Sequence, residues 1–306
     1  MLERVKADLV ALVKGQVLFD ELMKNHTSLE IGGYADALVI PNDIAEITRI
    51  LRFANTNGLR ITIMGNGTNL LVHDRGIDGI VIKIKDCLDD VAICQEKISV
   101  GAGYLLSKLC WLAASHGLSG LEFVVGIPGT VGGAVVMNAG AHGCAMSSIV
   151  TGAKVIGFDG RVKELSKSEM GFGYRSSKLL DGNVIVFKVD IEVKKAISSE
   201  VERIMADYME WRKAKQPLGM PSAGSIFKNP ENDFAGRLIE LAGCKGMTVG
   251  GAQVSPLHAN FIVNRADATA DNILQLIRQV QQAVAAKFDI ALAPEIKIIG
   301  RPISSS

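Results

Sequence analysis

The sequence lacks an excess of charge of either sign. It carries 33 basic and 32 acidic residues among 306, which gives a formal net charge of +1. It also has no long block of like charges. Proteins that hold nucleic acid or an anionic membrane surface by electrostatics need a positive field, and this composition does not supply one. We therefore expect neither a nucleic-acid partner nor a membrane partner.

Cysteine is also scarce. The five cysteines are odd in number, scattered along the chain and never spaced C-x-x-C. This pattern argues against a disulfide framework and against a zinc site, so we expect no metal. It is typical of a protein of the reducing cytosol. No signal peptide is visible at the N-terminus. The expected location is cytoplasmic.

One uncharged stretch is long enough to span a bilayer but lacks the continuous apolar run that a span requires. Residues 123–152 contain no acidic or basic side chain apart from a neutral His142. The same stretch holds seven glycines together with Pro128, Asn138 and several hydroxyl side chains. We therefore interpret it as part of a globular protein.

Both common nucleotide-binding motifs are missing as well. Gly65 and Gly67 follow a predicted strand, but no third glycine and no helix come after them, as a Rossmann fingerprint would need. No G-K-[ST] sequence occurs, which excludes a Walker loop. Any nucleotide must be bound in another way.

The sequence does have the material for a large core, with 48% hydrophobic residues and a mean hydropathy of +0.25. Its length indicates two or three domains. Periodicity predicts helices and strands in mixed order, without internal repeats, and so an α+β fold. The best domain seam is the stretch 215–224. The predicted helices are 1–15, 43–58, 104–117, 199–215, 233–243 and 270–288, and the predicted strands are 35–40, 59–64, 76–84, 183–193 and 294–300.

Three glycine-dense loops are candidate anion cradles: 64–71, 101–104 and 126–143. Glycine lets backbone N–H groups approach a phosphate closely, although a tight turn explains a single G-x-G equally well. The third loop belongs to the uncharged stretch of about thirty residues, which we expect to be buried and not helical, so its backbone groups need partners. A flavin dinucleotide would supply them; the alternative is a glycine-rich structural loop.

Several motifs, in order, carry a family resemblance. They are "GNGTNLLV", "LEFVVGIPGTVGGAVVMNAGA", "GYRSS", "PSAGSIFKNP", "GGAQVS", "HANFIVN" and "PEIKIIG". From about Asn25 to Gly300 the chain closely resembles the UDP-N-acetylenolpyruvoylglucosamine reductase family, in the form without the extra substrate-loop insertion. The resemblance implies an FAD-binding module of the vanillyl-alcohol-oxidase (PCMH) type in two subdomains, plus a C-terminal α+β substrate domain.

The implied domain boundaries divide the chain into four segments. They are an N-terminal helix at 1–19, FAD-binding subdomain 1 at 20–86, FAD-binding subdomain 2 at 87–215 and a substrate-binding domain at 216–294. Residues 295–306 are expected to return to the second subdomain.

The resemblance also implies a reaction. It is the NADPH-dependent reduction of the enolpyruvyl ether of UDP-N-acetylglucosamine to UDP-N-acetylmuramate, a cytoplasmic step of bacterial peptidoglycan synthesis. The implied cofactor is FAD, held without a covalent bond, and the partners are NADPH and the enolpyruvyl nucleotide. We expect a monomer.

Three residues are assigned to the chemistry by resemblance. Ser225 is the proton donor to the substrate carbon, with Gly224 leaving room beside it. Arg175 offers a planar fork to the substrate carboxylate. Glu295 is an acidic group suited to a dry site in which it is protonated or shares a proton. Each has a structural alternative: a turn hydroxyl for Ser225, a surface arginine for Arg175, and a partner of Lys297 for Glu295.

Further residues are carried over as ligand contacts. Tyr174, Lys215 and Asn229 are expected at the substrate, although Tyr174 serves equally well in packing and Lys215 as a solvated charge at a helix end. His258 is more readily explained as a structural histidine. The cofactor residues are Gly65, Asn66, Gly67, Thr68, Asn69, Leu70, Gly126, Pro128, Gly129, Thr130, Gly132, Gly133, Asn138, Ala139 and Gly140.

Two other functions stay open. One is an FAD-dependent sugar or alcohol oxidase of the same superfamily, which would commonly hold its flavin through a histidine or cysteine. His73, His142 and Cys144 lie near the glycine loops and suit that reading. The other is a non-catalytic nucleotide-sugar sensor, against which the positions Arg175, Ser225 and Glu295 weigh.

Overall fold

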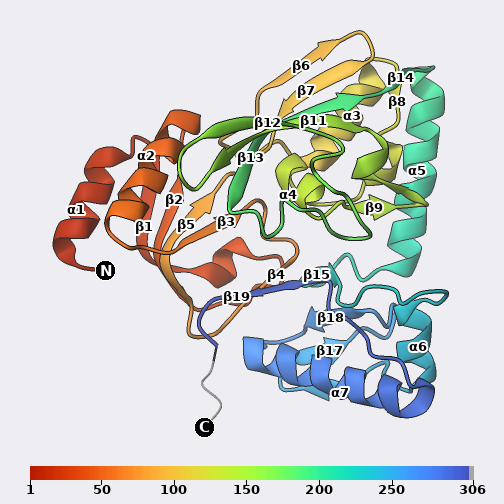
Figure 1. Ribbon diagram of the computed structural model, residues 1–306. Coiled ribbons are helices and arrows are strands. Elements are labelled where there is room, and N and C mark those ends of the chain that lie inside the picture. Colours follow the sequence, from red (N-terminus) through yellow and green to blue (C-terminus); the bar gives the residue numbers. More distant parts are fainter. Residues whose placement is uncertain (303–306) are drawn as a thin grey trace. The chain divides into compact units, whose positions relative to one another are not determined.

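The structure is a computed structural model, and it describes residues 1–302. The chain forms two compact units, each built from several separate segments (Figure 1). Unit 1 comprises Met1–Phe19, Ala37–Asn66 and Gly79–Trp211. Unit 2 comprises Asp20–Asp36, Gly67–Asp78 and the chain from Arg212 onward.

The first sheet has the strand order β1-β2-β5-β3, with β3 and β5 parallel. Helices α1 and α2 pack side by side next to it (Figure 1). The carboxylate of Asp43 caps α2 by accepting a hydrogen bond from the main-chain N–H of Glu46 at 2.7 Å. The apolar face of α2 is buried, and Gly58, with φ +63°, follows its end. The bounds are β1 Gln16–Leu22, β2 Tyr34–Ile40, β5 Ile77–Lys83, β3 Ile61–Met64, α1 Glu3–Leu12 and α2 Ile44–Thr56.

The second sheet of unit 1 is antiparallel, with the order β12-β11-β13-β7-β6. Its alternating apolar residues join those of α3 in one core. The bounds are β12 Val162–Ser166, β11 Val150–Gly157, β13 Val184–Glu192, β7 Lys97–Gly101, β6 Val91–Cys94 and α3 Leu106–Ser115. Three short helices complete the unit: α4 Val131–Val136, η2 Glu122–Val124 and η3 Met146–Ser148. Two short strand pairs are also present: β8 Leu118–Ser119 pairs with β14 Lys194–Lys195, and β9 Gly140–Ala141 pairs with β10 Cys144–Ala145. Helix α5, Ser198–Lys215, ends at the start of unit 2.

Unit 2 has an antiparallel sheet in the order β15-β18-β17-β16, covered by α6 and α7 (Figure 1). Its separate core centres on Phe227, Leu238 and Ile273. A capping box of Thr269 and Asn272 starts α7. The bounds are β15 Ser222–Ser225, β18 Phe261–Asn264, β17 Ala252–Val254, β16 Thr248–Val249, α6 Ala235–Leu241 and α7 Ala270–Phe288; η1 is Met23–His26, and β4 Leu70–Val72 pairs in parallel with β19 Lys297–Ile299.

The α+β prediction is confirmed, and each element predicted from periodicity is present within a few residues of its expected ends. Three expectations were wrong in detail. The uncharged stretch contains the helix α4, capped by Thr130. The segment 1–19 is helical only over Glu3–Leu12, because β1 begins at Gln16. The last strand pairs with β4, not with residues 87–215, and the final residues 303–306 lie outside the described part of the chain.

The two units also cut across the four predicted domains. Residues 20–36 and 67–78, expected in the first FAD subdomain, cluster with the C-terminal part of the chain. The change between units falls at Trp211–Arg212, within the last turns of α5 and just before the predicted seam at 215–224. The functional boundaries themselves stay a prediction. Within residues 1–302, no helix combines the length and apolar character needed to cross a membrane.

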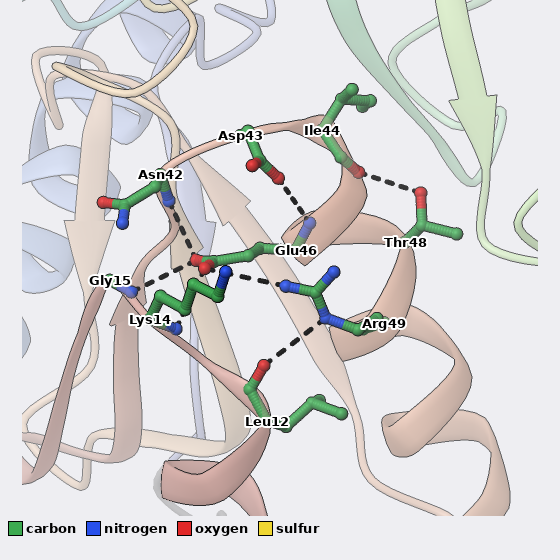
Figure 2. A network of polar contacts seen from close by, with 9 residues as sticks. All are labelled: Leu12, Lys14, Gly15, Asn42, Asp43, Ile44, Glu46, Thr48 and Arg49. Carbon is green, nitrogen blue, oxygen red and sulfur yellow. Dashed lines mark hydrogen bonds and ion pairs between the residues drawn. The ribbon is translucent and has the colours of Figure 1, made fainter.

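A buried carboxylate fastens the N-terminal segment to α2 in unit 1 (Figure 2). Glu46 is 1% exposed and accepts hydrogen bonds from the main-chain N–H groups of Lys14, Gly15 and Asn42 at 2.9, 3.2 and 2.9 Å. Nη2 of Arg49, on the same helix, lies 3.6 Å from Oε1 of Glu46 and supplies the opposite charge. The carboxylate of Glu46 thus accepts hydrogen bonds from three main-chain donors, and the guanidinium of Arg49 balances its negative charge.

We expect Glu46→Gln to lower the free energy of unfolding of unit 1 by about 3 kcal/mol, because the amide presents N–H groups to donors and leaves Arg49 without its charge partner. The change can be measured by urea denaturation followed by tryptophan fluorescence, since Trp111 and Trp211 both lie in unit 1. Glu3→Gln is the matched control: Glu3 is 90% exposed beside Lys6, and its loss should cost less than about 1 kcal/mol. Equal losses for the two variants would contradict the role given to Glu46.

Candidate active site

Ser225 ends β15, directly after a β-bulge in unit 2. From Ser222 to Ser225, β15 advances three residues while β18 advances two, from Val263 to Phe261. Gly224 lies within this stretch with φ +75°, in the left-handed region that strains other residues. Apart from its two chain neighbours, no described residue has an atom within 4 Å of the place that a Cβ of Gly224 would take. Ser225 follows a glycine because the bulge needs one, and the space beside that glycine is open.

The backbone after Ser225 is held from both sides. On one side, the side chain of Asn260 accepts a hydrogen bond from the N–H of Phe227 at 2.9 Å and donates one to its carbonyl at 2.8 Å. On the other side, the carbonyl of Ile226 accepts from the N–H of Glu295 at 2.7 Å, and the N–H of Lys228 donates to the carbonyl of Ala293 at 2.9 Å. Two predicted catalytic residues, Ser225 and Glu295, are therefore fastened to one short segment of backbone.

Glu295 is also fixed at its second main-chain polar group. Its carbonyl accepts a hydrogen bond from Nδ2 of Asn69 at 3.3 Å. The carbonyl of Asn69 in turn accepts from the N–H of Lys297 at 2.9 Å, within the β4–β19 pair. The side-chain amide of Asn69, predicted as a cofactor contact, is thus bonded to the main chain of Glu295. A contact of Asn69 with the cofactor stays a prediction.

Arg175 belongs to unit 1, in a tight turn closed by Gly173 and Ser176. Its φ is +50°, and its guanidinium Nη2 donates to the carbonyl of Gly140 at 2.7 Å. The same guanidinium lies 5.3 Å from the centre of the Tyr174 ring. Asn138 ties the turn further by donating from Nδ2 to the carbonyl of Gly173 at 2.8 Å. The motif "GYRSS" and the end of the third glycine loop therefore form one structure.

The two principal glycine loops also meet within unit 1. Asn66 donates from Nδ2 to the carbonyl of Pro128 at 2.6 Å. A Cβ on Gly65 would lie 2.4 Å from Oγ1 of Thr130, so a side chain at position 65 would force the loops apart. Loops separated in the sequence are brought together, as a shared ligand would require.

Four carbonyl oxygens of the two loops are bonded to protein donors. Those of Pro128 and Gly129 accept from Asn66 Nδ2 and from the N–H of Leu106, and those of Gly67 and Asn69 accept from the N–H groups of Ser28 and Lys297. Oxygens that would repel an anion are thereby turned toward the protein. This arrangement fits a phosphate-bearing cofactor, which binds backbone N–H groups.

Other predicted cofactor residues serve the loops' own structure. Gly132 donates its N–H to the carbonyl of Ala102 at 2.8 Å, and Gly133 donates to Oγ1 of Thr130 at 3.3 Å. The main-chain groups of Ala139 bond with Ala134 and Met146. Leu70 begins β4. Direct contacts of these residues with a cofactor, and those of Gly126 and Thr68, stay predictions.

The predicted substrate residues lie in both units. Tyr174 is 54% exposed beside Arg175, and Lys215 is an exposed last residue of α5. Asn229 has a structural role that the sequence did not reveal: its Oδ1 accepts from the N–H of Ala235 at 3.0 Å, at the start of α6. Substrate contacts of the three stay predictions.

His258 is held as a neutral, structural side chain. Its ring packs edge-to-face on Phe261 at 4.9 Å, and its Nδ1 accepts a hydrogen bond from the N–H of Asn260 at 3.2 Å. Burial lowers the pKa of His258, and the nearby charge of Lys245 acts in the same direction. An acceptor nitrogen carries no proton, which agrees with this direction.

Comparison with known families and proteins finds relatives that match nearly the whole chain. Residues 35–166 match the description "FAD binding domain", and residues 216–299 match "UDP-N-acetylenolpyruvoylglucosamine reductase, C-terminal domain". The enzyme named UDP-N-acetylenolpyruvoylglucosamine reductase of Bacillus licheniformis is 43% identical over 300 residues, covering 98% of this chain and 99% of its own. The chain belongs to the UDP-N-acetylenolpyruvoylglucosamine reductase family. One such reductase of Symbiobacterium thermophilum is 46% identical over 286 residues, with 94% of this chain and 93% of its own covered.

Solved structures agree with this membership. The crystal structure of the family's enzyme from Thermus caldophilus superposes with a TM-score of 0.79 at 37% identity, covering 93% of this chain and 98% of its own. BBE-like 1 of Physcomitrella patens shares the fold alone, with a TM-score of 0.50 at 16% identity over 62% of this chain and 44% of its own. The predicted fold, an FAD-binding module of the vanillyl-alcohol-oxidase type with a C-terminal α+β domain, is confirmed. The chain is an FAD-dependent oxidoreductase.

Proposed function

We propose that this protein reduces the enolpyruvyl ether of UDP-N-acetylglucosamine to UDP-N-acetylmuramate, with NADPH as the reductant. The observation that carries the proposal is the shared anchoring of Ser225 and Glu295 on the backbone at Ile226. Two residues that carry a hydroxyl and a carboxyl, and whose main chains are anchored at the same place, suit a reaction in which one carbon must be protonated beside a carboxylate. The relatives named for this reaction cover nearly the full length of the chain.

The glycine loops would hold FAD. The N–H groups of Gly65, Asn66, Gly129 and Thr130, all in unit 1, would face its pyrophosphate, since the carbonyls of Pro128 and Gly129 are engaged by the protein. Bound FAD would supply hydride transfer from NADPH to the substrate. The open space beside Gly224 leaves room for a planar ligand next to Ser225.

The protein's own groups would handle the charge and the proton. When the terminal methylene carbon of the enol ether receives hydride, negative charge develops at the neighbouring carbon and spreads onto the carboxylate. Arg175 would stabilise that carboxylate through its fork, as an electrostatic donor aimed at developing charge. The hydroxyl of Ser225 would protonate the carbon, which is far more basic than water. Glu295 would be the third group of the site, an acid that is protonated or shares a proton and can therefore lie near the substrate carboxylate.

The setting proposed for this reaction is the cytoplasm, within peptidoglycan synthesis, with the enolpyruvyl nucleotide and NADPH as the only partners and a monomer as the working form. The five cysteines, all free, support a reducing compartment. Burial and the carboxylate of Glu122 raise the pKa of the Cys110 thiol to about 12, which keeps it unreactive.

We expect the purified protein to be yellow and to release its flavin into the supernatant on acid precipitation. The absorption spectrum of supernatant and pellet measures this directly. Of the candidate attachment residues, His142 stacks on Tyr208 with ring centres 3.7 Å apart, which already occupies one face of the ring. Colour that stays in the pellet would support the oxidase alternative, and a colourless protein that takes up no added FAD would contradict both enzymes.

A further inference from the structure

We propose that Asn260 is a positioning residue for the proton transfer: its side-chain amide stands in for a neighbouring β-strand and fixes the hydroxyl of Ser225. The inference rests on the proposed function, and it assigns a role to a side chain that makes no contact with the reacting atoms.

The backbone needs an additional hydrogen-bond partner because of the bulge. After the bulge, β15 no longer has a regular partner on β18, whose first residue is Phe261, opposite Ser225. The next residues, Ile226 and Phe227, are buried, so their main-chain polar groups cannot be satisfied by water. The N–H of Ile226 bonds to the carbonyl of Asn260 at 2.8 Å. The main-chain N–H and carbonyl of Phe227 then still need hydrogen-bond partners, and a side chain has to supply them.

The amide of Asn260 matches those two groups. A primary amide carries a carbonyl acceptor and N–H donors, the same pair that a backbone peptide presents to an antiparallel neighbour. Asn260 is 4% exposed, and it uses the acceptor on the N–H and the donor on the carbonyl of the same residue, Phe227. The ladder is thereby extended past the bulge without a further strand residue.

The consequence reaches both predicted catalytic residues. Ser225 lies two residues before Phe227, and the carbonyl of Ile226 between them receives the N–H of Glu295. A shift of the backbone at 226–227 would therefore move the hydroxyl and the carboxyl together. Misplacement of a catalytic group by about 1 Å can cost 10²-fold in rate, so an amide outside the reacting groups can control the step.

The chain contains a matched control on the same strand. Asn264 is also buried, at 8% exposed, and its amide also joins two backbone groups: it donates to the carbonyl of Leu29 at 3.0 Å and accepts from the N–H of Ala268 at 3.0 Å. It lies at the other end of β18, next to Val263, whose partner Ser222 comes before the bulge. Loss of either amide leaves two buried backbone groups without partners, but only Asn260 bonds the segment that follows Ser225.

The experiment measures the two half-reactions by anaerobic stopped-flow absorbance. Wild-type protein is tested first: failure of the enolpyruvyl nucleotide to reoxidise the reduced flavin would overturn the proposed function itself. Given that activity, Asn260→Ala should slow reoxidation by the nucleotide about 10–100-fold and leave reduction by NADPH within about 2-fold. Asn264→Ala should leave both rates within about 2-fold. A wild-type reoxidation rate in folded Asn260→Ala, or an equal loss in Asn264→Ala, would overturn the inference.

Two further variants separate positioning from general loosening. In a Ser225→Ala background, Asn260→Ala should slow reoxidation much less than it does in the wild type, because the hydroxyl is gone and only the placement of Glu295 can still be lost; fully multiplied effects would contradict the inference. Asn260→Asp should recover speed as the pH falls, since only the protonated carboxyl can donate to the carbonyl of Phe227 while accepting from its N–H. A pH profile parallel to that of the wild type would also count against it.

Hydrogen exchange gives a readout that does not depend on turnover. The N–H of Phe227 is bonded to Asn260, so Asn260→Ala should speed exchange in peptides that contain residues 226–228 by about 10-fold or more. Asn264→Ala should instead affect the N–H of Ala268. Unchanged exchange at 226–228 would show that Asn260 does not hold this segment.

Discussion

Ser225→Ala is expected to divide the reaction into one half that works and one half that fails. Reduction of the flavin by NADPH should proceed at nearly the wild-type rate, whereas reoxidation by the enolpyruvyl nucleotide should slow by about 10²–10⁴-fold, the usual worth of a positioned proton donor. The first half forms no carbanion on the substrate, and so it needs no proton from this hydroxyl. The second half cannot finish without one.

The structure makes the alanine variant a clean test. Ser225 lies at the end of β15, where its main chain pairs with Phe261, and alanine preserves that pairing. Gly224, whose φ of +75° would strain any other residue, is untouched. The substitution therefore removes the hydroxyl with little change to the bulge. Ser225→Cys should retain more activity than Ser225→Ala, because a thiol can still donate a proton.

Anaerobic stopped-flow absorbance in the two half-reactions measures the effect. Ser222→Ala, on the same strand, is the control: the carbonyl of Ser222 accepts the hydroxyl hydrogen of Ser28 at 2.6 Å, and alanine keeps that carbonyl. Equal loss in both halves would mean that Ser225 positions the flavin. Normal reoxidation in Ser225→Ala would end its assignment as the acid.

The elements of this fold that could be predicted from the sequence are those with local causes. Helix α7 has the bounds that its periodicity predicted, because its buried stripe lies within the segment and its capping box begins at Thr269, directly before it. Helix α4 was missed. Its glycines have poor helix propensity, and it forms because Thr130 caps it and Val131 and Val135 are buried.

The candidate site could be predicted only in part, for a different reason. Motifs identified Ser225 and Glu295 individually, but the hydrogen bond from the N–H of Glu295 to the carbonyl of Ile226, next to Ser225, connects distant parts of the chain and depends on register. Asn260 was visible in "HANFIVN" without a role, because its role exists only once a bulge has ended the pairing of β15. Asn69 and Asn229 likewise bond to backbone groups that no local pattern identifies.

Arg175→Lys is expected to lower kcat by about 10²–10³-fold with little change in KM, the magnitude typical of an electrostatic donor to a transition state. Lysine keeps the positive charge but replaces a planar fork by a single rotating ammonium group. In this protein the fork has a fixed orientation, because Nη2 donates to the carbonyl of Gly140 at 2.7 Å. A lysine that made the same bond would have no second planar edge for the substrate carboxylate.

The backbone does not confound this comparison. Arg175 has φ +50°, which strains the backbone of any residue other than glycine, and this strain is the same for lysine as for arginine. The difference between the two proteins therefore measures the guanidinium. Arg161→Lys is the control, since Arg161 is 82% exposed beside Asp159 in the same unit and should leave kcat within about 2-fold. Steady-state kinetics with the enolpyruvyl nucleotide gives both constants. An Arg175→Lys protein with wild-type kcat would show that Arg175 does not bind the carboxylate, and a loss confined to KM would make it a ground-state contact.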